Sequence, residues 1–274
     1  MEDAAAGWEI ATPSRPWRVP GVAMAGFRAA GAVELGIVPF PAVTVAIGLG
    51  DGSLAVERGD RRVGGSAVIG LGSQGLRGGG RDVECLQVRC SPVVAHAVFE
   101  GIAAADGEVL GLAEVWGRDA ERLEERLRAA ASWEQRFAVL AAAVAARQAE
   151  GRRVDREVAF AWRELVRSRG TVRIDGLAAE LGWSRKRLWS RFRAQVGLSP
   201  KQAARLIRFD GAAHRLAAGQ LAALVAAESG YADQSHLHRE VADFMGVTPS
   251  AVAAAPWLAV DPVAWRAPGY LSGH

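Results

Sequence analysis

Two segments of this chain, 49 residues apart, repeat the same order of turn, helix and helix-exit signals. A glycine followed by an aromatic residue opens each segment, as Gly182-Trp183 in the first and Gly230-Tyr231 in the second. Four positions then correspond: Leu188, Phe192, Gly197 and Pro200 align with Leu237, Val241, Gly246 and Pro249. A small first helix, a tight glycine turn and a second helix are the pattern of a helix-turn-helix unit. The chain is therefore predicted to carry two such units.

The first unit can be followed residue by residue. We expect a short helix over about 175–181 that ends at Gly182, because glycine adopts the left-handed conformation of a helix exit at little cost. Ser184 is placed to cap a second, basic helix that runs to about Val196 and is closed by Gly197.

A helical wheel separates a buried face from an outward face in both second helices. Leu188, Phe192 and Gln195 fall on the buried side of the first, with Val196 on its flank. Leu237, Val241 and Phe244 fall on the buried side of the second. A lone basic helix is usually a solvated face, but two units in register favour readers of the DNA major groove. The predicted DNA contacts are Arg185, Lys186, Arg187, Trp189, Ser190, Arg193, Gln234, Ser235, His236 and Arg239.

The charge of the chain is divided unevenly along its 274 residues. Residues 1–151 hold 15 Lys and Arg against 19 Asp and Glu, a net charge of −4. Residues 152–274 hold 18 against 11, a net charge of +7. A basic half of this kind suits contact with a polyanion.

A long helix from Ser199 to Ala218 is predicted to join the two units and to set their separation. One stripe of it is basic, and we expect that stripe either to touch phosphates or to be solvated. The stripe consists of Lys201, Arg205, Arg208 and Arg215.

The N-terminal half changes from strand patterns to helix patterns at about Ser91. Strands are expected at 43–47, 67–69 and 83–88, with turns at 50–53, 70–72 and 78–80. This spacing favours a small antiparallel sheet, sandwich or barrel. Helices are expected after Ser91-Pro92, over 118–130, and over 133–147 behind a Ser132 cap. Apolar residues on the last two helices are candidates for a homodimer contact, with inward packing as the alternative: Leu123, Leu127, Phe137 and Val144.

The segment from about 155 to 255 resembles the DNA-binding domain of the AraC/XylS family of bacterial transcription regulators. The closest match is Gly230-Tyr231-Ala232-Asp233-Gln234-Ser235-His236-Leu237-His238-Arg239, followed by Gly246-Val247-Thr248-Pro249-Ser250. The resemblance implies a seven-helix, all-α domain with two recognition helices. It implies base contacts by Lys186, Trp189 and Ser190 in the first unit, and by Gln234, Ser235 and Arg239 in the second. Two positions depart from the family: Val241 replaces a usual aromatic residue, and Ser190 a longer side chain.

The resemblance also suggests a fold class and a division of the chain. The expected fold is α+β, in which an antiparallel sheet or cupin-like barrel with helices precedes the helical domain. The expected boundaries are 1–150 for a sensor or dimerisation domain, 151–255 for the DNA-binding domain, and 256–274 for a tail.

Enzyme and metal functions find little support in the sequence. His96 is the one histidine of the N-terminal half, and His236 and His238 point about 160° apart on a helix. Cys85 and Cys90 have no second Cys or His pair, so ordinary packing is expected. The glycine-rich stretches lack the Lys-Ser/Thr of a phosphate loop. We therefore expect no enzyme activity, no metal and no cofactor.

The sequence thus predicts a sequence-specific transcription regulator that binds double-stranded DNA and is controlled by a small-molecule effector. The alternative is a regulator whose N-terminal half serves only dimerisation or protein contacts, and a cupin enzyme with an accessory DNA-binding domain is remote. RNA polymerase is the expected further partner. No run of about 18 strongly apolar residues predicts a membrane span, so a cytoplasmic, nucleoid-associated protein is expected.

Overall fold

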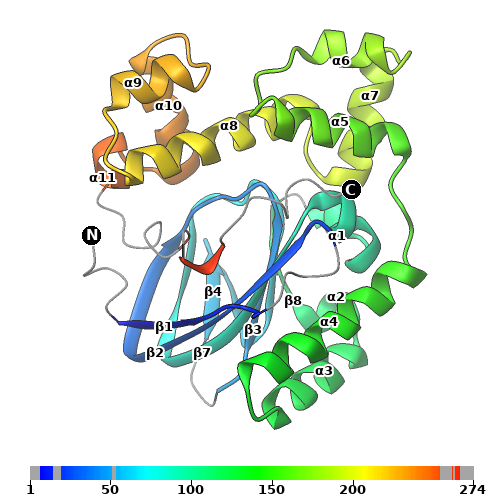
Figure 1. Ribbon diagram of the computed structural model, residues 1–274, viewed down its shortest axis with the longest axis vertical. Helices are drawn as coiled ribbons and strands as arrows, with labels where there is room; N and C mark the ends of the chain where they lie inside the picture. The colour runs from blue at the N-terminus through cyan, green and yellow to red at the C-terminus, as the bar shows by residue number, and fades with distance from the viewer. Residues whose placement is uncertain are drawn as a thin grey trace.

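The computed structural model describes residues 7–14, 20–50, 54–105, 107–253, 261 and 263–265. Figure 1 shows a curved sheet with helices α1 to α4 beside it, and helices α5 to α11 lying across one end of the sheet. The chain is therefore an α+β protein with an N-terminal antiparallel sheet and an all-helical C-terminal part, as predicted.

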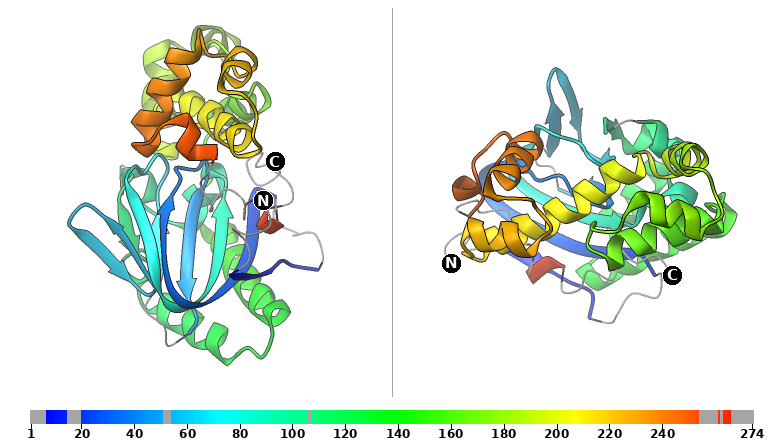
Figure 2. Two further views of the ribbon diagram at one scale, coloured as in Figure 1. Left: turned by 90° about the vertical axis from the view of Figure 1, so that its left-hand side faces the viewer. Right: turned by 90° about the horizontal axis from the view of Figure 1, so that it is seen from above.

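The described strands form one open antiparallel sheet in the order β1-β2-β7-β3-β6-β8, and β4 pairs with β5 and β7. The two long strands β2 and β7 form its centre, and the β4–β5 hairpin projects from it (Figure 2). The strands are β1 (Trp8–Ala11), β2 (Val22–Ile37), β3 (Val43–Gly48), β4 (Ala55–Arg58), β5 (Arg61–Gly64), β6 (Ala67–Ile69), β7 (Leu76–Cys90) and β8 (Val109–Gly111).

The three predicted strands are confirmed, but the predicted turn at 78–80 is wrong. These glycines lie inside β7 and pair with Val33–Leu35 of β2. A Cβ at Gly79 would collide with the carbonyl oxygen of Val33, so glycine permits a close approach of two backbones rather than a turn. Of the predicted turn at 50–53, residues 51–53 lie outside the described residues.

Alternation along β3 and β7 gives the sheet two different faces. Val43, Val45 and Ile47 of β3 are buried in the main core, together with Leu86, Val88 and Cys90 of β7. The intervening β7 residues Cys85, Gln87 and Arg89 line hollows on the opposite face. This alternation brings a polar and a charged side chain into an otherwise apolar surface.

The helices of the N-terminal half begin where their caps predict. Ser91 accepts a hydrogen bond from the Val94 amide at 3.3 Å, and Ser132 accepts one from the Gln135 amide at 3.3 Å. The elements are α1 (Pro92–Val98), the 3-10 turn η1 (Ile102–Ala105), α2 (Leu112–Trp116), α3 (Arg118–Ala129) and α4 (Trp133–Glu150).

The structure corrects the proposed dimer contact. The four candidate residues are between 0 and 3% exposed and belong to the core of their own chain: Leu123, Leu127, Phe137 and Val144. Helix α4 packs against α1 and α3, and the apolar stripes belong to one core cluster with residues of the sheet. Spacing alone identified the stripes, but it does not say which surface covers them.

Residues 151–155 lead from α4 into the helical part. Trp162 of α5 is fully buried there, 6.5 Å from the ring of Phe192. None of the described helices is long and apolar enough to cross a membrane. The C-terminal helices are α5 (Arg156–Arg167), α6 (Ile174–Glu180), α7 (Arg185–Val196), α8 (Pro200–Ala217), α9 (Ala222–Glu228), α10 (Gln234–Met245) and α11 (Pro249–Ala253).

We predict that Leu127→Glu unfolds the N-terminal half, because Leu127 is 0% exposed and a carboxylate there has no water and no partner. The matched control is Arg126→Glu, which places the same side chain on the exposed side of α3. Circular dichroism and urea unfolding distinguish the two variants. A folded, monomeric Leu127→Glu protein would contradict the core assignment.

Candidate functional site

The first helix-turn-helix unit consists of α6 and α7. Gly182, with a φ of 64°, makes the turn between them, and the Ser184 hydroxyl accepts a hydrogen bond from the Arg187 amide at 3.2 Å. Gly197 ends α7 in the left-handed conformation. Leu188, Phe192 and Gln195 are buried, as the helical wheel predicts. The local sequence therefore fixes both the ends and the rotation of α7.

The predicted contact residues of α7 lie on its outer side. Arg185, Lys186, Arg187, Trp189 and Ser190 are exposed, and Arg193 is half-buried. Two of the cations lie over aromatic rings: the Arg187 guanidinium is 4.5 Å from the Trp183 ring centre, and that of Arg193 is 5.7 Å from Trp189. The Trp189 side chain is 51% exposed, which is unusual for so large an apolar group. A cationic face with an exposed ring suits contact with both phosphates and base edges.

The second unit consists of α9 and α10. The Asp233 carboxylate caps α10 by accepting a hydrogen bond from the His236 amide at 2.7 Å. Gln234, Ser235 and Arg239 are exposed on its outer side.

His236 differs from these neighbours because it is half-buried. Its ring meets that of Tyr231 edge-on at 5.3 Å, and its Nδ1 accepts a hydrogen bond from the Ala232 amide at 3.4 Å. His236 thus helps to shape the turn before α10.

Helix α8 holds the second unit through a buried carboxylate. Glu240 of α10 is 2% exposed, and its Oε2 lies 2.9 Å from Arg205 Nε and 3.0 Å from Arg208 Nη2. The Tyr231 hydroxyl donates a hydrogen bond to Glu240 Oε1 at 3.1 Å. Asp243 adds a second, exposed partner for Arg205 at 3.0 Å.

These contacts give three arginines of the basic stripe on α8 partners inside the domain, in addition to the phosphate contact or solvation that the sequence suggests. Arg205 and Arg208 pair with Glu240, and Arg215 pairs with Glu228 of α9. Lys201 is the exposed member of the stripe. The arginines therefore join α8 to α9 and α10 by ion pairs. A helical wheel of α8 alone does not show these pairs, because the partner carboxylates lie on other helices.

The C-terminal end of α7 contacts both the start of α5 and the sheet half. The buried Gln195 side chain accepts a hydrogen bond at 2.7 Å from the amide of Asp155, the residue that precedes α5, and Arg191 pairs with the Asp155 carboxylate at 2.7 Å. His96 of α1 is hydrogen-bonded to the Gln195 backbone, and burial is the largest effect on this histidine and lowers its pKa. His96 therefore serves the contact between α1 and α7.

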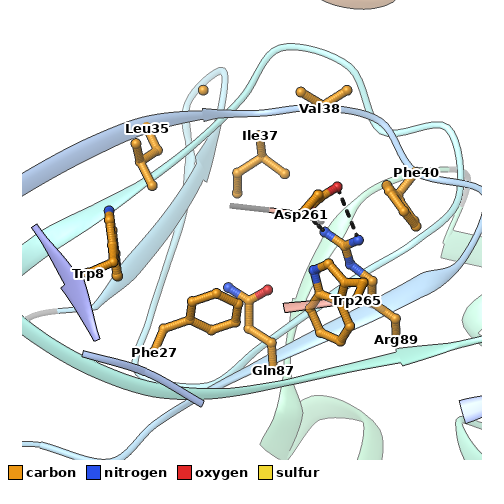
Figure 3. A pocket seen from close by; sticks show the side chains of 11 residues that line it. Trp8, Phe27, Leu35, Ile37, Val38, Phe40, Gln87, Arg89, Asp261 and Trp265 are labelled. Atoms are coloured by element: carbon orange, nitrogen blue, oxygen red, sulfur yellow. Dashed lines mark hydrogen bonds and ion pairs between the residues drawn. The ribbon is translucent and has the colours of Figure 1, made fainter. Parts of the chain in front are cut away.

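An apolar cavity of about 130 Å³ opens on the face of the sheet opposite the main core (Figure 3). Leu35, Ile37 and Val38 line it from β2 and the turn that follows, and Trp8 and Phe27 contribute aromatic walls. A neighbouring hollow of about 120 Å³ shares several of these residues. A cavity of this composition suits a small, largely apolar molecule.

Three polar or charged side chains enter this cavity: Gln87, Arg89 and Asp261. Arg89 Nη2 lies 3.0 Å from Asp261 Oδ1, and the Arg89 guanidinium lies 3.7 Å from the Phe40 ring centre and 4.2 Å from that of Trp265. Asp261 Oδ2 lies 3.2 Å from Nε2 of His214 on α8. One carboxylate thus joins a cation of the sheet to a cation of the helical half.

Sequence reasoning missed this cluster. A signal for Arg89 exists, because it interrupts the apolar strand 83–90 at a position of the same parity as Gln87. Asp261 and Trp265 lie beyond the recognised helices, in a stretch without helical or strand period. Asp261 and Trp265 reach the cavity through contacts with residues distant in sequence, Arg89, Phe27 and His214.

The electrostatics of the cluster keep it charged at neutral pH. Burial opposes charge on both partners, but the hydrogen bonds to Asp210 and Asp261 outweigh it and raise the pKa of His214 to about 10. For Asp261, burial is likewise outweighed by Arg89 and His214, and its pKa is lowered. Both groups are ionised, and each stabilises the other.

The part of the chain that the structure describes contains no group of three or more His, Cys, Asp or Glu side chains placed to hold a metal ion. Burial raises the pKa of both Cys85 and Cys90 to about 12, so these thiols stay protonated.

Residues 177–255, from within α6 to beyond α11, match the family model of a helix-turn-helix domain. This part of the chain is therefore a DNA-binding domain of the kind found in transcription regulators. The segment of about 155–255 that resembles the AraC/XylS family in sequence contains these residues.

The chain is similar to solved structures of ToxT from Vibrio cholerae. An apo variant from strain SCE256 is 12% identical with a TM-score of 0.49, and the match covers 88% of this chain and 99% of that chain. ToxT from strain O395 is 11% identical with a TM-score of 0.47, over 86% and 98% of the two chains. No curated protein matches the sequence.

We predict that Glu240→Gln lowers the free energy of unfolding of the protein by about 3 kcal/mol, because it leaves two arginines beside a neutral group in a buried site. Asp243→Asn is the matched control, since Asp243 pairs with the same Arg205 but its side chain is 61% exposed, and it should cost less than about 1 kcal/mol. Urea unfolding measures both. Equal costs would show that Glu240 does not fasten α10.

We also predict a pH dependence that originates at His214. Its pKa in the folded protein lies above the unfolded value of about 6.5, so its contribution to stability is complete below that pH. The contribution is lost as the pH rises from about 6.5 towards about 10. The difference in free energy of unfolding between wild type and His214→Gln should therefore shrink across this window. A difference that is constant with pH would contradict the ion pairs with Asp210 and Asp261.

Proposed function

We propose that this protein is a sequence-specific transcription regulator of the AraC/XylS type, controlled by a small molecule that binds in the cavity of the sheet. The observation that carries the proposal is the pair of helices α7 and α10, each the second helix of its unit. Both present polar and cationic side chains outward and apolar side chains inward. Such faces suit insertion into the major groove.

The geometry of α8 supports reading of two sites by one chain. Its 18 residues span about 27 Å at about 1.5 Å per residue, and the two units lie at its opposite ends (Figure 1). Successive major-groove segments on one face of DNA are about 34 Å apart. A helix of this length suits two insertions in neighbouring turns of one duplex.

The cavity supports control by an effector. It lies on the sheet face opposite the main core, and its apolar lining with few polar groups is typical of small-molecule sites. This favours an effector-controlled regulator over one whose N-terminal half serves only dimerisation or protein contacts. RNA polymerase is the partner through which such a regulator acts, and the nucleoid is where it works.

The test uses the full-length chain and an operator selected from a random DNA pool. We predict that Arg239→Ala weakens specific binding by about 1–3 kcal/mol and relaxes the choice of base at one position, as expected for a side chain that reads a base edge. Lys186→Ala and Trp189→Ala should act in the same direction at positions read by α7. Selection followed by sequencing, with a binding titration, measures both effects.

The matched control is Arg122→Ala, which removes an exposed arginine from α3 in the sheet half. It should leave operator affinity and base choice unchanged. If Arg239→Ala behaves like Arg122→Ala while remaining folded, α10 is not a base reader and the proposal fails at that helix.

A further inference from the structure

The cavity of the sheet is partly occupied by the chain itself. Asp261 and Trp265 contribute to its wall, although they follow the helix-turn-helix domain in sequence (Figure 3). The Trp265 amide donates a hydrogen bond to the Asp261 carbonyl at 2.8 Å, so the two residues belong to one helical turn and are held together. This turn presents a carboxylate and an indole side by side.

Each of these two groups has a partner in the cavity. The carboxylate accepts hydrogen bonds from both terminal nitrogens of Arg89, at 3.0 and 3.3 Å. The indole of Trp265 lies 6.2 Å from the Phe27 ring and under the Arg89 guanidinium, and Trp265 is 9% exposed. The cavity therefore already holds a carboxylate and an aromatic ring, both of which the protein itself supplies.

The same carboxylate reaches the DNA-binding half. Its Oδ2 lies 3.2 Å from His214 Nε2, and the His214 ring also meets the edge of Phe40 at 6.2 Å. His214 lies on α8, which carries the second helix-turn-helix unit through Glu240. The Asp261 carboxylate is thus shared between the cavity and the helix that positions α10.

We propose that the turn containing Asp261 and Trp265 is an internal occupant of the effector cavity, and that an aromatic carboxylic acid displaces it from Arg89 and thereby breaks the link to His214. This inference rests on the proposed effector control and adds the class of ligand and the route of regulation. Two carboxylates beside one guanidinium repel each other in a poorly solvated site, so an incoming acid and Asp261 exclude each other. A neutral ligand binds beside the turn and leaves it in place.

The test is a calorimetric titration of the full-length chain with indolepropionate, which carries the same two groups as the internal turn. Indolepropionamide is the neutral counterpart. Asp261→Asn removes the competing charge, so its affinity for indolepropionate should rise at least about tenfold, equivalent to about 1.4 kcal/mol. Its affinity for the amide should stay that of the wild type.

The matched control is Asp243→Asn. It removes a carboxylate that also pairs with an arginine, Arg205 of α8, but that lies outside this cavity. It should bind indolepropionate as the wild type does. Arg89→Gln should lose preference for the acid over the amide, and Arg89→Lys should retain it. Circular dichroism confirms that each variant is folded.

A second readout follows the displacement in the wild-type protein. Nuclear magnetic resonance titration of His214 with and without saturating indolepropionate should show a lower pKa in the presence of the acid, because the ring loses one of its two carboxylate partners. An unchanged pKa overturns the displacement. Equal affinity of wild type and Asp261→Asn for the acid overturns the competition and makes the turn a fixed wall of the cavity.

The outcomes separate this inference from the proposed function. If neither protein binds the acid or the amide, the ligand class is wrong, while operator binding by α7 and α10 is unaffected. If the acid displaces Asp261 but operator binding is absent, the inference stands as a property of the cavity and the proposed function fails.

Discussion

The long antiparallel pair of β2 and β7 determines how the remaining parts of the protein are arranged. Because side chains alternate along β7, one set seals the core under α1 to α4 and the other set faces a cavity. The pair also bends: an extra residue on β2 opposite Asp82 forms a bulge, where the Gly31 amide donates a hydrogen bond to the Asp82 carboxylate at 2.7 Å. The cavity lined by Leu35, Ile37 and Gln87 lies between these two strands and the residues Asp261 and Trp265.

Charge pairing in the helical half serves architecture as much as recognition. Arginines on α8 are turned towards carboxylates of α9 and α10, whereas those on α7 remain largely outward. The net positive charge of this half is thus divided into a neutralised set within the domain and an outward set on the recognition helices. For this reason, net charge indicates a polyanion partner but does not identify the residues that touch it.

Local signals explain which parts could be predicted from sequence. Gly182, Ser184 and Gly197 determine the ends of α7 through backbone conformation and capping, and the buried positions on α7 and α10 follow from helical period. Strands 43–47 and 83–88 also follow from a local signal, their short runs of apolar and alternating residues. Contacts between distant segments could not be derived this way. The glycines 78–80 resemble a turn until β2 is placed beside them, and the apolar stripes of α3 and α4 resemble an interface until each covers the other.

Helices α7 and α10 are connected to the sheet half in different ways. The side-chain amide of Gln195 binds Asp155 at the start of α5, whereas His96 is hydrogen-bonded to the Gln195 backbone and joins the end of α7 to α1 in the sheet half. Helix α10 is instead held by α8, which contacts the sheet half through His214, paired with Asp261 and packed against Phe40. Loss of the Asp261 carboxylate therefore removes a contact of α8 and leaves the contact of α7 with α1 in place.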